Sequence, residues 1–356
     1  MKILIACDKF KGSLSAIEAC EAIAAGLPEH DCELCPIADG GEGFVDALLA
    51  VAGGEKVMAQ CRDALGREVA AEYALLPDGS AVIEMSAASG LWRIDEAEQD
   101  PLFSNTYGTG QLMRHAIEQH GAKRLLVGIG GSATNDGGVG MAEALGVIFT
   151  NSEGQPVLPV PATFLEIQKI DQSGRIDLPP ITVACDVTNP LLGPQGATSI
   201  FGPQKGAKPD QLPELEKALS HVASLLDCDS NILGAGAAGG LGFGLRYFCD
   251  AEIVSGFELV SEALKLEEQI AGVDLVITGE GSLDEQTLEG KGPAGVAALA
   301  RKAGKKVIGI AGQVTDEAKL LFDQTLALKD LDLPLETLMH DARSLLTQMV
   351  RERAAL

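Results

Sequence analysis

The sequence is poor in positive charge. Its 356 residues include 27 lysines and arginines against 51 aspartates and glutamates, which gives a formal net charge of −24. This field repels nucleic acids and anionic membrane surfaces, so we expect neither as a partner. It also repels small anionic substrates, so any such ligand must meet a local cluster of cations or a metal ion.

Long hydrophobic runs are also missing. No stretch reaches the roughly 18 apolar residues that a membrane span needs. The amino-terminal MKILIACDKF has only a short apolar run before charge resumes, which is too short for the core of a secretion signal. We therefore expect a soluble protein that is not exported.

Cysteine and histidine are present without the spacing of a metal or redox site. The eight cysteines are scattered, and a chain of this length does not depend on disulfides, so we expect a reduced, cytoplasmic location. Cys32 and Cys35 form a CxxC pair, but no second pair follows at zinc-ribbon spacing and the motif begins a predicted strand. His115 and His120 lie five apart, off the shared helical face of a zinc site, and no Ser–His–Asp set is visible.

The two ends of the chain alternate between apolar runs and helical patterns. Residues 2–7 predict a buried strand, a helix begins at the capping box of Ser15 and Glu18, and a second strand and helix come near 33–38 and 44–51. Near the carboxyl end the same rhythm predicts three further strands, DLVIT, KKVIGIA and TLAL, and a closing amphipathic helix. Together these strands predict a five-stranded flavodoxin-like parallel sheet in the order 2-1-3-4-5.

The middle of the chain has a different pattern. Its first part alternates around two turn signals, Gly66 and Asp78-Gly79, which predicts antiparallel hairpins. The length of the chain also favours two domains. We predict a second α/β domain, residues 59–258, inserted between strands 2 and 3 of a discontinuous flavodoxin-like domain, residues 1–58 and 259–356.

A long glycine-rich loop, GIGGSATNDGGVG, follows the apolar run LLVGI. Glycines let backbone N–H groups approach a ligand, and such a loop at a strand-to-helix turn suits phosphate or carboxylate. The loop lacks the GK[ST] of a P-loop and is no clean dinucleotide fingerprint, so close packing of glycines explains it equally well on this evidence. The residues that we predict to bind phosphate in it are Gly130, Gly131, Ser132, Thr134, Asn135 and Asp136.

Five segments, in this order, closely resemble the bacterial type-1 glycerate kinases. They are DKFKGSLSA (8–16), DGGEG (39–43), GIGGSATNDGG (128–138), CDVTNPLLG (185–193) and TGEGSLDEQT (278–287). The resemblance runs from the first strand to the C-terminal helix. It implies ATP-dependent phosphorylation of D-glycerate with Mg²⁺, usually to 2-phosphoglycerate, on a two-domain fold with one domain inserted in the other. We expect a monomer or a homodimer.

Phosphoryl transfer needs cations and a carboxylate that orients or deprotonates the attacking hydroxyl. Lys9 and Lys11 follow the first strand, with Ser13 beside them, and there they could bind a phosphate or the glycerate carboxylate; we assign Lys11 to catalysis. A solvated lysine pair is the alternative. Lys291, just before a predicted helix, adds another cation at an anion site or is an exposed loop lysine.

Carboxylates follow two of the predicted strands. Asp186 ends the run ITVAC, with Asn189 beyond it, and could take the proton of a substrate hydroxyl; it could equally cap the turn that follows. Glu280 and Asp284 could hold Mg²⁺, which binds through one or two carboxylates plus phosphate oxygens. A capping box of Ser282 with Glu285 offers a purely structural explanation of that segment.

The sequence leaves the ATP-binding domain and the choice between the 2- and 3-hydroxyl open. We expect loops of both domains to line one cleft that closes over the transferring phosphoryl group. Two other functions are weighed against the kinase. A nicotinamide-dependent oxidoreductase of small hydroxy acids would need a dinucleotide fingerprint and a well-placed histidine, and a noncatalytic effector-binding protein would close on its ligand without turnover.

Overall fold

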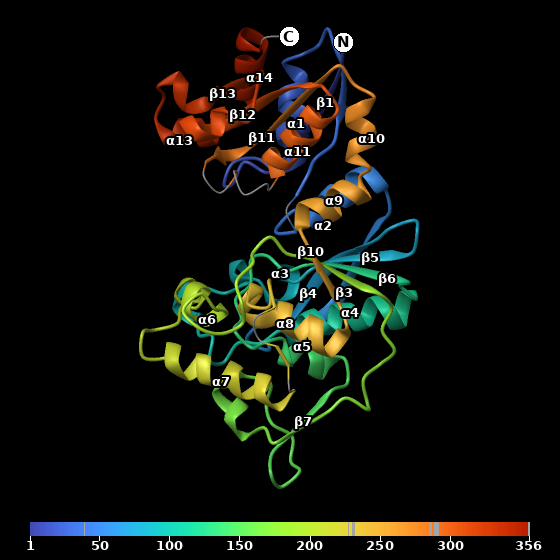
Figure 1. The fold of residues 1–356 in the computed structure, drawn as a ribbon, viewed down its shortest axis with the longest axis vertical. Coiled ribbons are helices and arrows are strands. Elements are labelled where there is room, and N and C mark those ends of the chain that lie inside the picture. The colour runs from blue at the N-terminus through green and yellow to red at the C-terminus, as the bar shows by residue number, and fades with distance from the viewer. Residues whose placement is uncertain (39, 227, 230–231, 285–286, 288–291, 355–356) are drawn as a thin grey trace. The chain divides into compact units, whose positions relative to one another are not determined.

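The computed structural model describes all residues except 39, 227, 230–231, 285–286, 288–291 and 355–356. The chain packs as two compact units, each with its own sheet (Figure 1). The first unit comprises Met1–Asp39, Asp46–Gly53 and Gly256–Leu356, and the second comprises Gly40–Val45 and Gly54–Ser255. Both units combine helices with strands, as the α/β prediction requires.

The first unit contains a five-stranded sheet in the order β13-β12-β11-β1-β2, in which all neighbours are parallel. This is the predicted 2-1-3-4-5 order. The central pair is β1 and β11, which come from opposite ends of the chain. The strands are β1 (Lys2–Cys7), β2 (Asp31–Leu34), β11 (Leu275–Leu283), β12 (Lys306–Val314) and β13 (Gln324–Ala327).

Helices of the first unit join the two ends of the chain. The predicted capping box begins α1, since Glu18 N–H donates to Ser15 Oγ and Ser15 N–H donates to Glu18 Oε2 at 2.9 Å. Helices α1 and α14 lie side by side (Figure 1), and Ile23 and Leu346 from them share one hydrophobic core with Ile5. The helices are α1 (Ala16–Ala25), α2 (Phe44–Ala52), α9 (Gly256–Ala263), α10 (Leu266–Ala271), α11 (Gly292–Lys302), α12 (Asp316–Lys319), α13 (Leu335–His340) and α14 (Ala342–Arg353), with the 3₁₀ turn η6 (Leu328–Leu331).

The second unit contains a six-stranded mixed sheet in the order β10-β9-β6-β5-β4-β3. Strands β3, β4 and β5 form the predicted antiparallel hairpins, and β5, β6, β9 and β10 are parallel to one another. Along the chain all of these strands come after β2 and before β11. They are β3 (Glu55–Arg62), β4 (Glu68–Leu75), β5 (Ser80–Glu84), β6 (Arg124–Gly128), β9 (Ile181–Ala184) and β10 (Glu252–Val254), and a small antiparallel pair adds β7 (Ile148–Thr150) and β8 (Lys169–Asp171).

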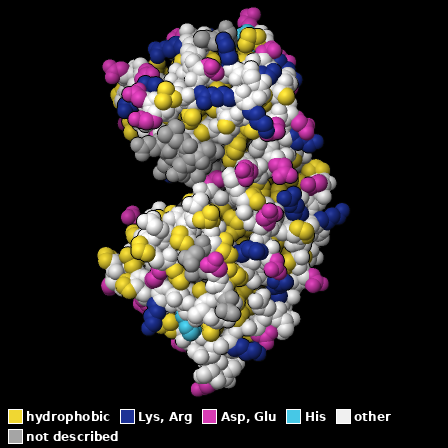
Figure 2. Space-filling model, in the orientation of Figure 1, with side chains coloured by type: hydrophobic (Ala, Val, Ile, Leu, Met, Phe, Trp, Pro, Cys, Tyr) yellow, Lys and Arg dark blue, Asp and Glu magenta, His cyan; other side chains and the backbone are white. Residues whose placement is uncertain are grey.

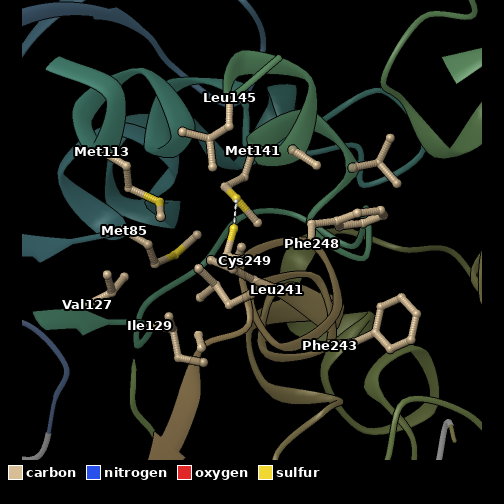
Figure 3. Packing of buried hydrophobic residues seen from close by; sticks show 14 of the residues in the cluster. Met85, Met113, Val127, Ile129, Met141, Leu145, Leu241, Phe243, Phe248 and Cys249 are labelled. Atoms are coloured by element: carbon tan, nitrogen blue, oxygen red, sulfur yellow. Dashed lines mark hydrogen bonds between the residues drawn. The ribbon is translucent and has the colours of Figure 1, made fainter. Parts of the chain in front are cut away.

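Sulfur-rich packing fills the core of the second unit. Figure 3 shows Met85, Met113 and Met141 turned toward one another, with Cys249 and Phe248 completing the cluster. The Sγ of Cys249 lies 3.5 Å from Met141 Sδ, and flexible thioethers suit the irregular space between the elements. The helices of this unit are α3 (Ser86–Ser89), α4 (Tyr107–His120), α5 (Val139–Ala144), α6 (Ala197–Phe201), α7 (Leu212–Leu225) and α8 (Ala237–Cys249), with 3₁₀ turns η1 (Leu91–Arg93), η2 (Glu96–Glu98), η3 (Pro161–Glu166) and η4 (Pro203–Lys205).

The structure corrects two predicted strands. The strand expected near residues 33–38 is β2, which runs from Asp31 to Leu34. The predicted strand DLVIT ends at Thr278, but β11 continues to Leu283. Strand β12 continues beside it, so that Ser282 pairs with Gln313 and Leu283 with Val314. Backbone hydrogen bonding to β12 thus extends β11 through a glycine-containing segment whose local sequence is typical of a turn.

The cysteines carry no redox pair. All eight are free thiols. Burial raises the pKa of Cys35 to about 12 and that of Cys32 above its usual value, so both stay protonated near neutral pH. That the CxxC pair has no metal or redox use stays a prediction.

Charge and hydropathy can also be compared with the sequence-based expectations. Figure 2 shows acidic and basic side chains interspersed over the face drawn, although acidic residues outnumber basic ones in the sequence. Among the described residues, no helix is long and apolar enough to cross a membrane.

Candidate functional site

The four parallel strands of the second unit end in one row. The register pairs Glu84 with Gly128, Gly128 with Ala184, and Ala184 with Val254. The loops that follow these residues therefore leave from the same edge of the sheet, where open α/β folds bind their ligands. These loops include the glycine-rich loop and Asp186, so the structure brings both predicted features to one edge.

The segment Gly40–Val45 packs on this edge. A Cβ added to Gly40 would lie 2.6 Å from the Ala184 Cβ, and one added to Gly128 would lie 2.4 Å from Gly40 O. Gly130 N–H donates to Gly40 O at 3.4 Å. The glycines are needed here because two backbones approach each other without room for side chains.

The glycine-rich loop has an exposed start. Gly130 is half-buried and Gly131 is exposed, with a φ of +73°. The loop is held against the α3–η1 segment, since Leu91 N–H donates to Gly131 O at 2.9 Å and Ala133 N–H donates to Ser89 O at 3.0 Å. Within the part of the chain that the structure describes, no residue accepts a hydrogen bond from the N–H of Gly131 or Ser132. Backbone N–H groups of this kind are the donors that an anion needs.

The end of the same loop is buried around Asp136. This side chain is 0% exposed. Its Oδ2 accepts from Thr106 N–H at 2.8 Å, from Thr106 Oγ1 at 2.7 Å and from Gly140 N–H at 3.1 Å, and its Oδ1 accepts from Gly138 N–H at 3.3 Å. Burial raises the pKa of Asp136, and these hydrogen bonds oppose that rise. In this conformation the carboxylate organises the loop from inside.

Thr134 and Asn135 are also fully buried. Asn135 Nδ2 donates to Thr198 Oγ1 at 3.0 Å, and Thr134 O accepts from Lys205 Nζ at 2.7 Å. Their assignment to phosphate binding, like that of Asp136, stays a prediction, because these side chains face the interior here.

Lys205 is a functional candidate that the sequence did not single out. Its side chain is 1% exposed, and burial lowers its pKa to about 7 while the charge of Asp136 acts to raise it. The only local signal is a lysine between two glycine turns in FGPQKGA, because its partner Thr134 lies 71 residues earlier.

A second glycine run, GAGAAGGLGFG (234–244), is a packing element. Ala238, Gly239 and Gly240 have positive φ angles and kink the start of α8. A Cβ on Gly239 would lie 2.0 Å from Thr134 O, and Gly239 O accepts from Gly137 N–H at 3.0 Å. The run therefore lets α8 approach the backbone of the first glycine-rich loop.

Asp186 lies half-buried after β9. Its Oδ1 accepts from Ser255 Oγ at 3.0 Å, and Ser255 follows the neighbouring strand β10. The amide of Asn189 donates to Gln195 O at 2.8 Å, and Asn189 O accepts from Gly236 N–H at 2.9 Å. Asn189 thus shapes its own loop, whereas Asp186 is oriented by a hydroxyl group from the adjacent strand.

In the first unit, the loop after β1 is a tight turn. Ser13 N–H and Ser13 Oγ both donate to Phe10 O, at 2.8 and 2.9 Å, and Gly12 adopts a φ of +81°. Lys9 is half-buried and Lys11 is exposed. The Ser13 hydroxyl therefore stabilises the turn that presents the two lysines.

Glu280 and Asp284 both hydrogen-bond with Thr287 near the end of β11. Thr287 Oγ1 donates to Glu280 Oε1 at 2.8 Å and accepts from Asp284 N–H at 3.1 Å, while Ser282 Oγ donates to Asp284 Oδ2 at 2.8 Å. Among the residues that the structure describes, no group of three or more histidine, cysteine, aspartate or glutamate side chains is placed to hold a metal ion. Two carboxylates still suffice for Mg²⁺ when phosphate oxygens complete its shell. Lys291 and the Glu285 of the expected capping box lie outside the described residues.

Asp8 is a second candidate that the sequence analysis passed over. It is 7% exposed and directly follows β1, where its N–H donates to Gly279 O at 2.8 Å. Lys9 N–H donates to Asp8 Oδ1 at 2.6 Å. Because β1 and β11 are parallel neighbours with Cys7 beside Gly279, Asp8 emerges next to Glu280. Asp8 is the first residue of the DKFKGS segment, in which the sequence analysis considered only the two lysines and the serine.

Comparison with known proteins places the chain. The model of the family described as "Glycerate kinase family" matches residues 3–356. A glycerate kinase of Halalkalibacterium halodurans is 42% identical over 99% of this chain and 97% of its own length. A glycerate 2-kinase of Escherichia coli is 46% identical over 89% of this chain and 86% of its own length.

A solved structure agrees. The crystal structure of a Salmonella typhimurium protein assigned as glycerate kinase 2 superimposes with a TM-score of 0.87 at 42% identity, covering 99% of this chain and 96% of that one. With 99% of the chain covered, the likeness extends over both units. The chain belongs to the glycerate kinase family.

Proposed function

We propose that this protein transfers the γ-phosphoryl group of ATP to D-glycerate and forms 2-phosphoglycerate. The observation that carries the proposal is the match of the family over residues 3–356. The name of the Escherichia coli relative, a glycerate 2-kinase, supports the 2-hydroxyl as the acceptor. In this proposal the inserted domain, residues 59–258, and the discontinuous domain, residues 1–58 and 259–356, each supply part of the chemistry.

The second unit would bind an anion and hold the base. The N–H groups of Gly131 and Ser132, for which no described residue is the acceptor, suit phosphate or carboxylate oxygens. Asp186 is proposed to orient the glycerate hydroxyl and take its proton. Its hydrogen bond from Ser255 Oγ fixes the carboxylate orientation, which supports this role.

The first unit would supply charge neutralisation. Glu280, Asp284 and the adjacent Asp8 are oxygen donors of the kind that Mg²⁺ prefers. Thr287 Oγ1 donates to the Glu280 carboxylate and accepts from the backbone N–H of Asp284, which keeps these two residues on one turn. When bound, Mg²⁺ would neutralise charge on the phosphate oxygens. Lys9 and Lys11 would bind anionic oxygens of the substrates and stabilise developing charge, with Lys11 nearer to the transferring group. That the two sets of residues line one cleft stays a prediction.

A direct assay tests the reaction. Purified protein with Mg-ATP and a panel of small hydroxy acids should release ADP with D-glycerate, and phosphorus NMR should identify the product as 2-phosphoglycerate. Removal of Mg²⁺ with a chelator should stop turnover. An absence of glycerate-dependent ADP would contradict the kinase, and ligand binding without ADP would favour a noncatalytic effector-binding protein. A product phosphorylated at the 3-hydroxyl would contradict only the choice of acceptor.

A further inference from the structure

Lys205 places a buried ammonium group at the glycine-rich loop. Its side chain is 1% exposed, and Nζ donates to Thr134 O at 2.7 Å. Lysine is almost never fully buried without a reason, because desolvation of its charge is costly. Its burial therefore indicates a role other than that of a solvated surface charge.

The loop itself has no cation. GIGGSATNDGGVG contains one charged side chain, Asp136, which is negative, and the whole protein carries a net charge of −24. An anion at this loop would meet an unfavourable field without a nearby positive charge. Charge interactions are stronger in a buried site than in water, so a buried ammonium next to the loop can attract a bound anion without contacting it.

Two polar atoms beside this lysine point to an unfilled requirement. Thr134 Oγ1 and Asn135 Oδ1 are buried, and neither has a hydrogen-bond partner among the described residues. Buried polar side chains are normally paired. A water or ligand oxygen that enters when the loop takes up an anion would complete them, with Lys205 held against the same stretch of backbone.

We propose that Lys205 is a positioning residue for anion binding: it holds the Thr134 carbonyl in place and supplies the positive charge that the glycine-rich loop lacks. The ligand would be an anionic oxygen group, either the phosphates of Mg-ATP or the carboxylate of D-glycerate. This inference rests on the proposed function for the choice of ligands. Lys205 acts through the loop and is not itself a contact of the substrate.

A consequence concerns protons. Because the pKa of Lys205 is about 7, more than half of the protein carries it uncharged at pH 7.5. An anion beside the loop would raise that pKa, so Lys205 would gain its positive charge as the anion binds. Asp136 faces it from the glycine loop. The η4 turn that bears Lys205 packs Gly206 against Gln99, and the neighbouring Asp100 accepts from Gln211 Nε2 at 3.3 Å. Binding should therefore be accompanied by proton uptake.

Calorimetric titration tests the proposal. Mg-ATP and D-glycerate would be titrated separately into the unaltered protein and into Lys205→Met, Lys205→Arg and the matched control Lys208→Met, an exposed lysine of the same segment. We expect Lys205→Met to raise one of the two dissociation constants about tenfold or more, about 1.4 kcal/mol. Lys205→Arg should recover part of that loss, and Lys208→Met should leave both within about twofold. The affected ligand identifies the anion.

A second measurement guards against misfolding. Titrations of the unaltered protein at pH 7.5, in two buffers of different ionisation enthalpy, should show net proton uptake with the affected ligand, and Lys205→Arg should remove it. A folded Lys205→Met protein that binds both ligands within twofold would overturn the inference. If that variant does not fold, an absence of proton uptake by the unaltered protein would overturn it instead.

The outcome is separable from the proposed function. If the unaltered protein forms no glycerate-dependent ADP, titration with inorganic phosphate still tests Lys205, and a Lys205-dependent affinity would support the inference while the kinase reaction fails. If ADP forms normally and the Lys205→Met affinities are unchanged, the inference alone fails.

Discussion

Asp136 should be a principal determinant of stability in the second unit. It is fully buried and accepts from the backbone N–H groups of Thr106, Gly138 and Gly140, and from the Thr106 hydroxyl. In Asp136→Ala, three backbone donors lose their acceptor, and each unsatisfied buried donor costs about 1–3 kcal/mol. The expected loss is about 3–9 kcal/mol, with entry of water favouring the lower half of this range.

The asparagine variant should behave differently. The amide oxygen of Asp136→Asn can take the place of Oδ2 and keep the contacts with Thr106 and Gly140, which leaves the amide nitrogen facing Gly138 N–H at the position of Oδ1. One donor is then lost, so the expected cost is about 1–3 kcal/mol.

Urea unfolding followed by circular dichroism measures both losses, with thermal melting as a second readout. Asp210→Ala, at an exposed aspartate of the same unit, should change stability by less than about 0.5 kcal/mol. An Asp136→Ala protein within about 1 kcal/mol of the unaltered one would refute the reasoning, as would an asparagine variant less stable than the alanine variant.

Four further predictions concern Lys205, Asp186, Lys11 and Gly239. The pKa of Lys205 is lowered from 10.5 to about 7 on folding, so the unfolded chain binds more protons than the folded protein between these pH values. The free energy of unfolding should therefore rise with pH across that window, by up to about 1.4 kcal/mol per pH unit. Urea unfolding from pH 7 to 10 should show a shallower rise for Lys205→Met. Asp186→Asn should lower kcat about 10²- to 10⁴-fold with little change in the KM for ATP; steady-state ADP release measures both, and an unchanged kcat would remove Asp186 as the base. Lys11→Ala should raise the KM for glycerate or ATP, and steady-state kinetics in which neither constant changes would show that this lysine does not bind substrate. Gly239→Ala should be more destabilising in thermal melts than Gly121→Ala, since both positions have positive φ but only the Gly239 Cβ would meet Thr134 O, at 2.0 Å; equal losses would contradict the packing role of the second glycine run.

Local patterns were sufficient for much of the fold. Continuous apolar runs predicted β1 and β12, the turn signals at Gly66 and Asp78-Gly79 predicted the β3–β5 hairpins, and Ser15 with Glu18 predicted the start of α1. Each of these features depends on residues close together in the chain, so its physical cause is visible in the sequence itself.

Other features depend on residues that are distant in sequence. Strand β11 extends to Leu283 because β12 provides its hydrogen-bonding partner. Asp8 comes to lie beside Glu280 only through the parallel pairing of β1 with β11. Tertiary pairing thus decided the neighbourhood of the predicted metal-binding carboxylates.

The glycine-rich loop separates the two kinds of information most clearly. Its composition by itself predicted a glycine-rich turn between a strand and a helix. In the structure Gly131 is exposed there, and no described residue accepts from its N–H. Only the tertiary structure decided that Asp136 accepts from the N–H groups of Thr106 and Gly140. The same holds for Lys205, 71 residues after Thr134, which donates to the Thr134 carbonyl. Burial and charge pairing are properties of the folded arrangement, because desolvation and Coulomb attraction depend on distance in space and not on separation along the chain.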